Sequence, residues 1–164
     1  MQLLGIDPGC RYAGYGIIKT EGSTIYLIEH GLLKLSQTQS LVQRVAAFHD
    51  FFAEKIVKHG VTDIAIETPF LGKNAQNFLK LGYLRGIIYL LSHKHAITLH
   101  EFSPTEVKQA ITGYGTASKD QVARVLYQLF PRIPPFERED VSDALAVTLC
   151  GLWRGNQNRL VGLR

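Results

Sequence analysis

The chain begins with three segments whose apolar and polar positions follow the pattern of β-strands. Residues 2–6 read QLLGI, residues 14–20 read GYGIIKT, and residues 24–35 read TIYLIEHGLLKL. Aliphatic and aromatic residues at these spacings favour extended backbone, and the polar turn EGS between the second and third segments is typical of a hairpin. We therefore expect the chain to start with three antiparallel strands.

After these segments, helical and extended patterns alternate. Residues 41–59 carry apolar side chains at helical spacing and are followed by Gly60, the residue type favoured just past a helix end. Ser103 and Ser118 each begin a capping box, with Glu or Gln three residues later. The predicted later strands are 61–67 and 96–102, and the predicted helices are 41–59, 74–92, 103–111, 118–130 and 139–153.

This order predicts an α/β fold in which helices flank a mixed five-stranded sheet. At 164 residues the chain has the size of one domain, which we expect to span residues 1–154, followed by a basic tail at 155–164. The start MQLLGID lacks the basic region of a signal peptide, and the longest apolar stretch, 87–91, is too short to cross a bilayer. Cys10 and Cys150 form no Cys-x-x-Cys motif, so we expect a reduced, cytoplasmic protein.

The charge of the chain is unevenly distributed. The formal net charge is +4 and the isoelectric point is about 9.1. Residues 68–135 contain eight Lys or Arg against three Asp or Glu. A basic surface is usually only a solvated one, but basic residues gathered in one region favour a nucleic acid as the partner.

Two of the predicted strands end in an acidic residue. Asp7 follows LLGI and precedes a Pro-Gly pair, where we expect a type II turn, and Glu67 follows DIAI. Each acid has a small residue two positions earlier, Gly5 or Ala65, which predicts a hollow beneath the carboxylate. If the two strands are parallel neighbours, both carboxylates lie at the carboxyl edge of the sheet, where open α/β sheets place their ligands.

The predicted last helix supplies two more acids. Asp140 and Asp143 are three residues apart and share a helix face that continues inward through Ala144 and Val147. Four carboxylates without a thiolate or imidazole favour Mg²⁺ or Mn²⁺ over zinc. Two such ions, about 3.5–4 Å apart, would activate water and stabilise the leaving oxygen in phosphodiester hydrolysis. Each acid alone also has an ordinary explanation, as a turn residue, a strand end or a first-turn acid favoured by the helix dipole.

Two further features concern partners. Lys119 lies in the first turn of a capped helix, where the dipole disfavours a cation, so a bound phosphate would explain it better than helix stability does. The alternative is a tolerated surface lysine. The helix predicted at 74–92 is apolar nearly all round, and Gly82 and Gly86 would let another backbone approach. A symmetric homodimer is the interpretation we favour over burial by the same chain.

Several motifs together resemble the RuvC family of Holliday-junction resolvases over nearly the whole chain. They are GIDPG, AIE with Phe70 and KNA after it, KLG, VK, GYGTASKDQV and DVSDALA, in the family's order and spacing. The resemblance implies a ribonuclease H-like fold and a homodimer that cuts four-way DNA junctions by paired nicking. It also implies two Mg²⁺ ions per site, with Mn²⁺ as a substitute, products with 5′-phosphate and 3′-hydroxyl ends, and the branch-migration proteins RuvA and RuvB as partners.

The resemblance also implies roles for individual residues. The family's four acidic positions are Asp7, Glu67, Asp140 and Asp143, and its two basic positions near the scissile phosphate are Lys108 and Lys119. We expect DNA contacts from Phe70, as the aromatic inserted at the junction, and from Lys73, Asn74, Arg85, Lys108 and Lys119. Cys10 and the pair Thr68-Pro69 depart from the family's usual residues.

Two alternatives come from other functional classes. GIDPG also resembles the first phosphate loop of actin-like ATPases and sugar kinases, which need a second such domain for which this chain is too short. A non-catalytic junction-binding module would have no use for four convergent acids. An assay that compares metal-dependent DNA nicking with ATP turnover distinguishes the first alternative from a nuclease.

Overall fold

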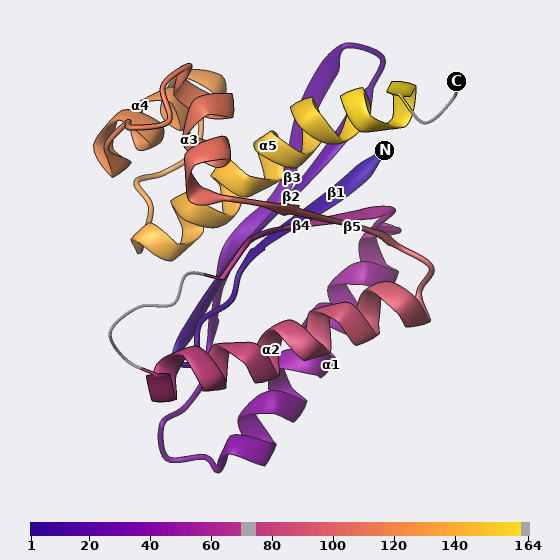
Figure 1. Cartoon of the computed structure of the whole chain (residues 1–164), viewed down its shortest axis with the longest axis vertical. Coiled ribbons are helices and arrows are strands. Elements are labelled where there is room, and N and C mark those ends of the chain that lie inside the picture. The colour runs from indigo at the N-terminus through magenta and orange to yellow at the C-terminus, as the bar shows by residue number, and fades with distance from the viewer. Residues whose placement is uncertain (70–74, 162–164) are drawn as a thin grey trace.

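A computed structural model of the chain describes residues 1–69 and 75–161, with side chains given as far as residue 155. It contains a five-stranded sheet with helices on both faces (Figure 1). The strands are β1 (Gln2–Asp7), β2 (Tyr12–Glu21), β3 (Thr24–Lys34), β4 (Asp63–Glu67) and β5 (Thr98–Phe102). The helices are α1 (Leu41–His59), α2 (Ala75–Lys94), α3 (Pro104–Thr112), α4 (Lys119–Leu129) and α5 (Glu139–Val161).

The sheet is mixed, as the sequence predicted, and its strand order is β3-β2-β1-β4-β5. The first three strands are antiparallel, whereas β4 is parallel to both β1 and β5. In the β1–β4 pair, Gly5 lies opposite Ala65 and Ile6 opposite Ile66. This register brings the last residues of β1 and β4, Asp7 and Glu67, to the same edge of the sheet.

The helices form two layers, each with its own hydrophobic core. Helices α1 and α2 cover one face, and α3, α4 and α5 cover the other (Figure 1). Fully buried Phe48 and Phe52 of α1 lie in the first core, and fully buried Leu126 and Leu145 lie in the second. Among the helices that the structure describes, none is long and apolar enough to cross a membrane.

Helix α5 packs unusually close to the centre of the sheet, because glycines face it. A Cβ atom at Gly5 would lie 2.0 Å from Thr148 Oγ1, and one at Gly14 would lie 1.8 Å from the backbone oxygen of Asp140. The hollow predicted behind the two strand-end acids is therefore filled by this helix. The small residues allow α5 to approach, and its approach carries Asp140 and Asp143 toward Asp7.

The sequence signals for helix ends are confirmed by the structure, whereas one predicted turn is wrong. The capping boxes of Ser103 and Ser118 are both present, and Gly60 adopts the left-handed conformation after α1. The type II turn expected at the Pro-Gly pair is wrong, because Gly9 lacks the positive φ that this turn requires. A Cβ atom there would instead lie 1.9 Å from the Tyr12 backbone oxygen, so glycine is needed for space.

The ends of two helices also differ from the prediction. Helix α2 continues to Lys94 rather than residue 92, and α5 continues to Val161 rather than residue 153. The helix therefore crosses the boundary expected between the domain and a tail at 155–164. Glycine and charged residues at the end of α5 obscured its periodicity.

Replacing Gly14 with alanine tests the contact between α5 and the sheet. We expect Gly14→Ala to lower the midpoint of thermal unfolding by many degrees, because its Cβ would meet rigid backbone of α5. Gly16→Ala is the matched control in the same strand, since its Cβ would meet the movable end of the Leu145 side chain at 2.5 Å. The control should cost about 1–3 kcal/mol, as overpacking usually does. Equal decreases of the unfolding midpoint in the two variants would show that α5 can move away from the sheet to accommodate a Cβ atom.

Candidate active site

The candidate site is built from two strand ends and the first turns of one helix. Asp7 and Glu67 end the parallel neighbours β1 and β4. Asp140 and Asp143 lie in the first turns of α5, on the face turned toward the sheet. The structure thus brings together the four acids that the sequence indicated, from three segments that are far apart along the chain.

The four carboxylates repel one another. Burial and the charges of Asp143, Asp140 and Glu67 raise the pKa of Asp7 to about 8. Burial and the charge of Asp143 raise the pKa of Glu67 as well, while Lys119 and Lys108 act in the opposite direction. The site therefore concentrates more negative charge than its own surroundings neutralise.

Two cations engage the acids of α5. Lys119 Nζ lies 2.9 Å from Asp143 Oδ2 and 2.9 Å from Glu139 Oε2. Arg138 Nε lies 2.9 Å from Asp140 Oδ2. Although partial burial lowers it, the hydrogen bonds to Asp143 and Glu139 raise the pKa of Lys119 overall. Lys119 is thus a cation at neutral pH, and its role is electrostatic rather than that of a base.

Lys108 approaches the acids from the other side of the same opening. Together with Glu67, Lys119 and Asp143 it lines a cavity of about 220 Å³ between α3, α4 and α5. The structure therefore places both lysines from the sequence prediction beside the acids. A phosphate group in this cavity would face two positive charges.

The donor set fits a divalent cation by its chemistry. In the ranges that the structure describes, no three His, Cys, Asp or Glu side chains are arranged to hold a metal ion. Asp143 and Asp140 instead turn to Lys119 and Arg138. All four donors are nevertheless carboxylates, the ligands that a hard cation prefers. A bound cation would also reduce the repulsion that Asp7 experiences from the other three acids.

Arg85 does not occupy the DNA-facing position expected of it. Its side chain is 7% exposed, forms an ion pair with Glu101 and donates a hydrogen bond to the backbone oxygen of Glu67. This contact fixes the end of β4 that carries the acid. A DNA phosphate could reach Arg85 only if the side chain left this ion pair.

Three other expected DNA contacts, Phe70, Lys73 and Asn74, lie outside the described residues. Conversely, the structure shows polar residues beside the acids that the sequence patterns did not single out. These are Arg138, Glu139 and Tyr12, whose ring lies against Arg138. The available sequence signal was the charged run ERED, at residues 137–140, where α5 begins. Tyr12, which contacts Arg138 of this run, lies in β2, more than a hundred residues earlier.

A mixed five-stranded sheet in this order, with carboxylates at its carboxyl edge, is the arrangement of the ribonuclease H-like class of folds. The family model described as "Crossover junction endodeoxyribonuclease RuvC" matches residues 3–151, and the chain belongs to this family. Its members are divalent-metal-dependent nucleases.

Individual relatives agree over almost the whole chain. A protein with the same description from Pelodictyon phaeoclathratiforme is 39% identical over 155 residues, covering 94% of this chain and 81% of the relative. One from Legionella pneumophila is 34% identical over 163 residues, covering 99% and 93%. The structure of Thermus thermophilus RuvC in complex with a Holliday junction substrate matches with a TM-score of 0.89 at 24% identity, covering 96% of each chain. This likeness confirms the fold.

The repulsion at Asp7 predicts how pH and metal affect stability. Because its folded pKa of about 8 exceeds the ordinary value of 3.8, stability falls as pH rises between these values. Without metal, Asp7→Asn should therefore raise the unfolding midpoint by several degrees at pH 8 and change it little near pH 4. Mg²⁺ should stabilise the wild type more than the variant. A variant that is no more stable than wild type at pH 8 would contradict the assigned repulsion.

Proposed function

We propose that this chain resolves Holliday junctions by metal-dependent, paired symmetric nicking of two DNA strands in recombination and repair. The observation that carries this proposal is the convergence of four carboxylates at one sheet edge, where burial and the charges of the other three raise the pKa of Asp7 to about 8. Membership of the crossover junction endodeoxyribonuclease family supplies the reaction class. The junction-bound Thermus thermophilus protein supports the substrate by analogy.

The acids are the residues that would hold the metal. Asp7, Glu67, Asp140 and Asp143 would bind two Mg²⁺ ions, with Mn²⁺ able to replace them. Such ions would lower the pKa of a water and stabilise the leaving oxygen. If water attacks the phosphorus and the bond to the 3′ oxygen breaks, the products carry the 5′-phosphate and 3′-hydroxyl ends that the family resemblance implies. The protein's contribution is to hold the acids on rigid elements, since β1, β4 and α5 are all packed in its cores.

The lysines would position the phosphate. Lys119 remains protonated and stands at the first residue of α4, and Lys108 lines the same cavity from α3. A scissile phosphate entering this cavity would meet both charges, and Lys119 could exchange its bonds to Asp143 and Glu139 for bonds to phosphate oxygens. Such preorganised charge stabilises the transition state of phosphoryl transfer.

A homodimer would place two such sites on one junction. One side of α2 remains apolar and exposed in the single chain: Leu79, Tyr83, Tyr89 and Leu90 are between 42% and 57% exposed. Gly82 and Gly86 lie on the same side, and a Cβ atom at either would contact nothing. This surface, the α2 face, is where we place the second copy.

The remaining expectations follow from the family. Phe70 would insert at the crossover, where pairing is already weak, and Lys73 and Asn74 would reach base edges and give the cut a sequence preference. RuvA and RuvB would deliver the junction. Action on bacterial chromosomal DNA would place the protein in the cytoplasm.

A cleavage assay with two substrates tests the function. With Mg²⁺, the protein should nick a labelled mobile four-way junction symmetrically and leave a linear duplex of the same sequence largely intact. Asp143→Asn should reduce cutting by at least about 100-fold, because a metal ligand loses its charge, while junction binding stays within a few-fold. Equal cutting of both substrates would contradict the junction assignment alone. ATP turnover without nicking would favour the actin-like alternative.

The α2 face can be tested by a charge placed at its centre. Gly86→Glu should convert the dimer to a monomer in sedimentation velocity, because nothing in the single chain opposes the new side chain but a second α2 would. Val57→Glu is the control, since Val57 is an exposed apolar residue of α1, 70% accessible. A Gly86→Glu variant that sediments like the wild type would place the dimer contact elsewhere.

A further inference from the structure

Two arginines lie close to the ring of Tyr12, at the margin of the candidate active site. The Cζ atom of Arg138 lies 4.1 Å from the centre of the Tyr12 ring, and that of Arg11 lies 5.3 Å from it. An arginine stacked on a ring keeps its N–H groups free at the edge of the guanidinium plane, where they suit phosphate oxygens. The arrangement therefore presents two oriented donors beside the acids.

These residues line a groove that shares no lining residue with the lysine cavity, although a further pocket, lined by Lys119, Arg138, Asp140 and Asp143 among others, shares residues with both. The groove has a volume of about 400 Å³ and is lined by Gly9, Cys10, Arg11, Tyr12, Arg138 and Asp140. The lysine cavity is lined by Glu67, Lys108, Lys119 and Asp143 instead. The two openings therefore border different members of the acid group, the first Asp140 and the second Glu67 and Asp143.

The groove is positively charged and held in place. Its lining contains two guanidinium groups against one carboxylate, and that carboxylate already binds Arg138. Within the part of the chain that the structure describes, no ion pair involves Arg11. The backbone oxygen of Cys10 accepts hydrogen bonds from Gln37 and Arg44, which fixes the loop that carries Arg11.

We propose that Arg11, Tyr12 and Arg138 form a binding subsite for a backbone phosphate of the DNA strand. This subsite, the arginine–tyrosine subsite, rests on the proposed nuclease function and adds a contact on the Asp140 side of the acids. The lysine cavity would take one phosphate of the strand and this groove another. A strand held on both sides of the metal-binding acids would be fixed in its direction across the site.

The contact between Arg138 and Asp140 makes part of this subsite depend on metal. In the structure, Arg138 Nε lies 2.9 Å from Asp140 Oδ2. A divalent cation bound to the carboxylates would reduce the negative charge that Asp140 offers to the guanidinium, and Arg138 would then be available to phosphate. Among the described residues no carboxylate forms an ion pair with Arg11, so its contact would form with or without metal.

Salt-dependent binding of a labelled four-way junction tests these assignments, in Ca²⁺ and in EDTA. Each lost phosphate contact reduces the slope of log affinity against log salt by about 1. Arg138→Gln should therefore flatten the slope by about one unit in Ca²⁺ and by much less in EDTA. Arg11→Gln should flatten it by about one unit in both conditions. Thermal scans confirm that each variant is folded, and Arg11→Gln remains a test if Arg138→Gln does not fold.

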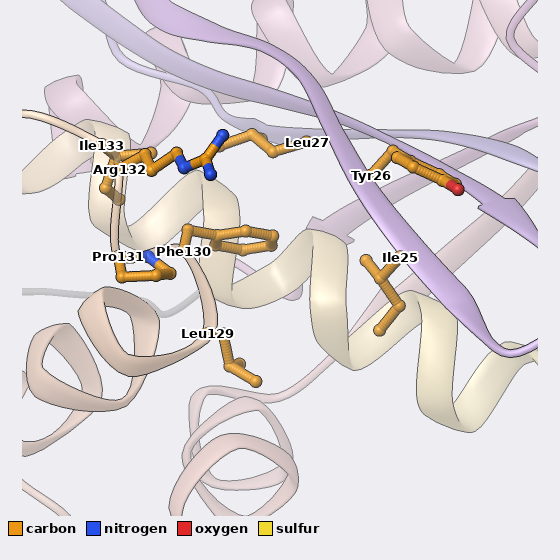
Figure 2. Close-up of a pocket in the computed structure, with 8 residues that line it drawn as sticks. All are labelled: Ile25, Tyr26, Leu27, Leu129, Phe130, Pro131, Arg132 and Ile133. Carbon is orange, nitrogen blue, oxygen red and sulfur yellow. The ribbon is translucent and has the colours of Figure 1, made fainter.

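Arg132→Gln is the matched control, with the same loss of charge in the same connection between α4 and α5. Arg132 lines a different, mainly apolar groove against β3, with Leu27, Phe130 and Ile133 (Figure 2). We expect its slope to match the wild type in both conditions. A similar decrease of the slope in all three variants would show that only the net charge matters, and would overturn the subsite. Unchanged slopes for both Arg11→Gln and Arg138→Gln would also overturn it.

The wild type separates the two proposals. If it binds and cuts the junction while the two subsite variants behave like wild type, only the arginine–tyrosine subsite fails. If the wild type neither prefers nor cuts a four-way junction, the proposed function itself fails.

Discussion

The close contact between α5 and the sheet is the constraint on which the rest of the site depends. It exists because Gly5 and Gly14 offer no side chain where the helix crosses β1 and β2. The same contact forces Asp140 and Asp143 into the field of Asp7. The packing of the core and the accumulation of charge at its edge therefore have one cause in the structure.

The repulsion among these acids costs stability, and the cations that contact Asp140 and Asp143 are exposed rather than buried. Lys119 and Arg138 reach the acids of α5 from the protein surface, with side chains 58% and 47% exposed. Exposed ion pairs of this kind contribute little stability and exchange readily. Such pairs would suit the proposed metal site, because no packed group would have to be displaced when a cation binds the carboxylates.

The sequence was most informative where a signal was local. Capping boxes at Ser103 and Ser118 and the glycine after α1 defined helix ends correctly. The four acids were found because each stands at the end of a regular element, where hydrophobic periodicity stops. Contacts between distant segments were beyond such signals. The stacking of Arg138 on Tyr12 and the burial of Arg85 depend on how β2, α2 and α5 meet in space, which no pattern within one segment specifies.

Arg85 connects α2 directly to the sheet edge that carries the candidate site. Its guanidinium joins the backbone oxygen of Glu67 to Glu101, so the ends of β4 and β5 are tied to a helix whose exposed face includes Tyr89, a residue that Arg85 contacts. Displacement of that helix along its axis would be transmitted to the Glu67 carboxylate over a single side chain. A partner bound to the exposed surface of α2 would therefore influence the position of the Glu67 carboxylate through the Arg85 side chain.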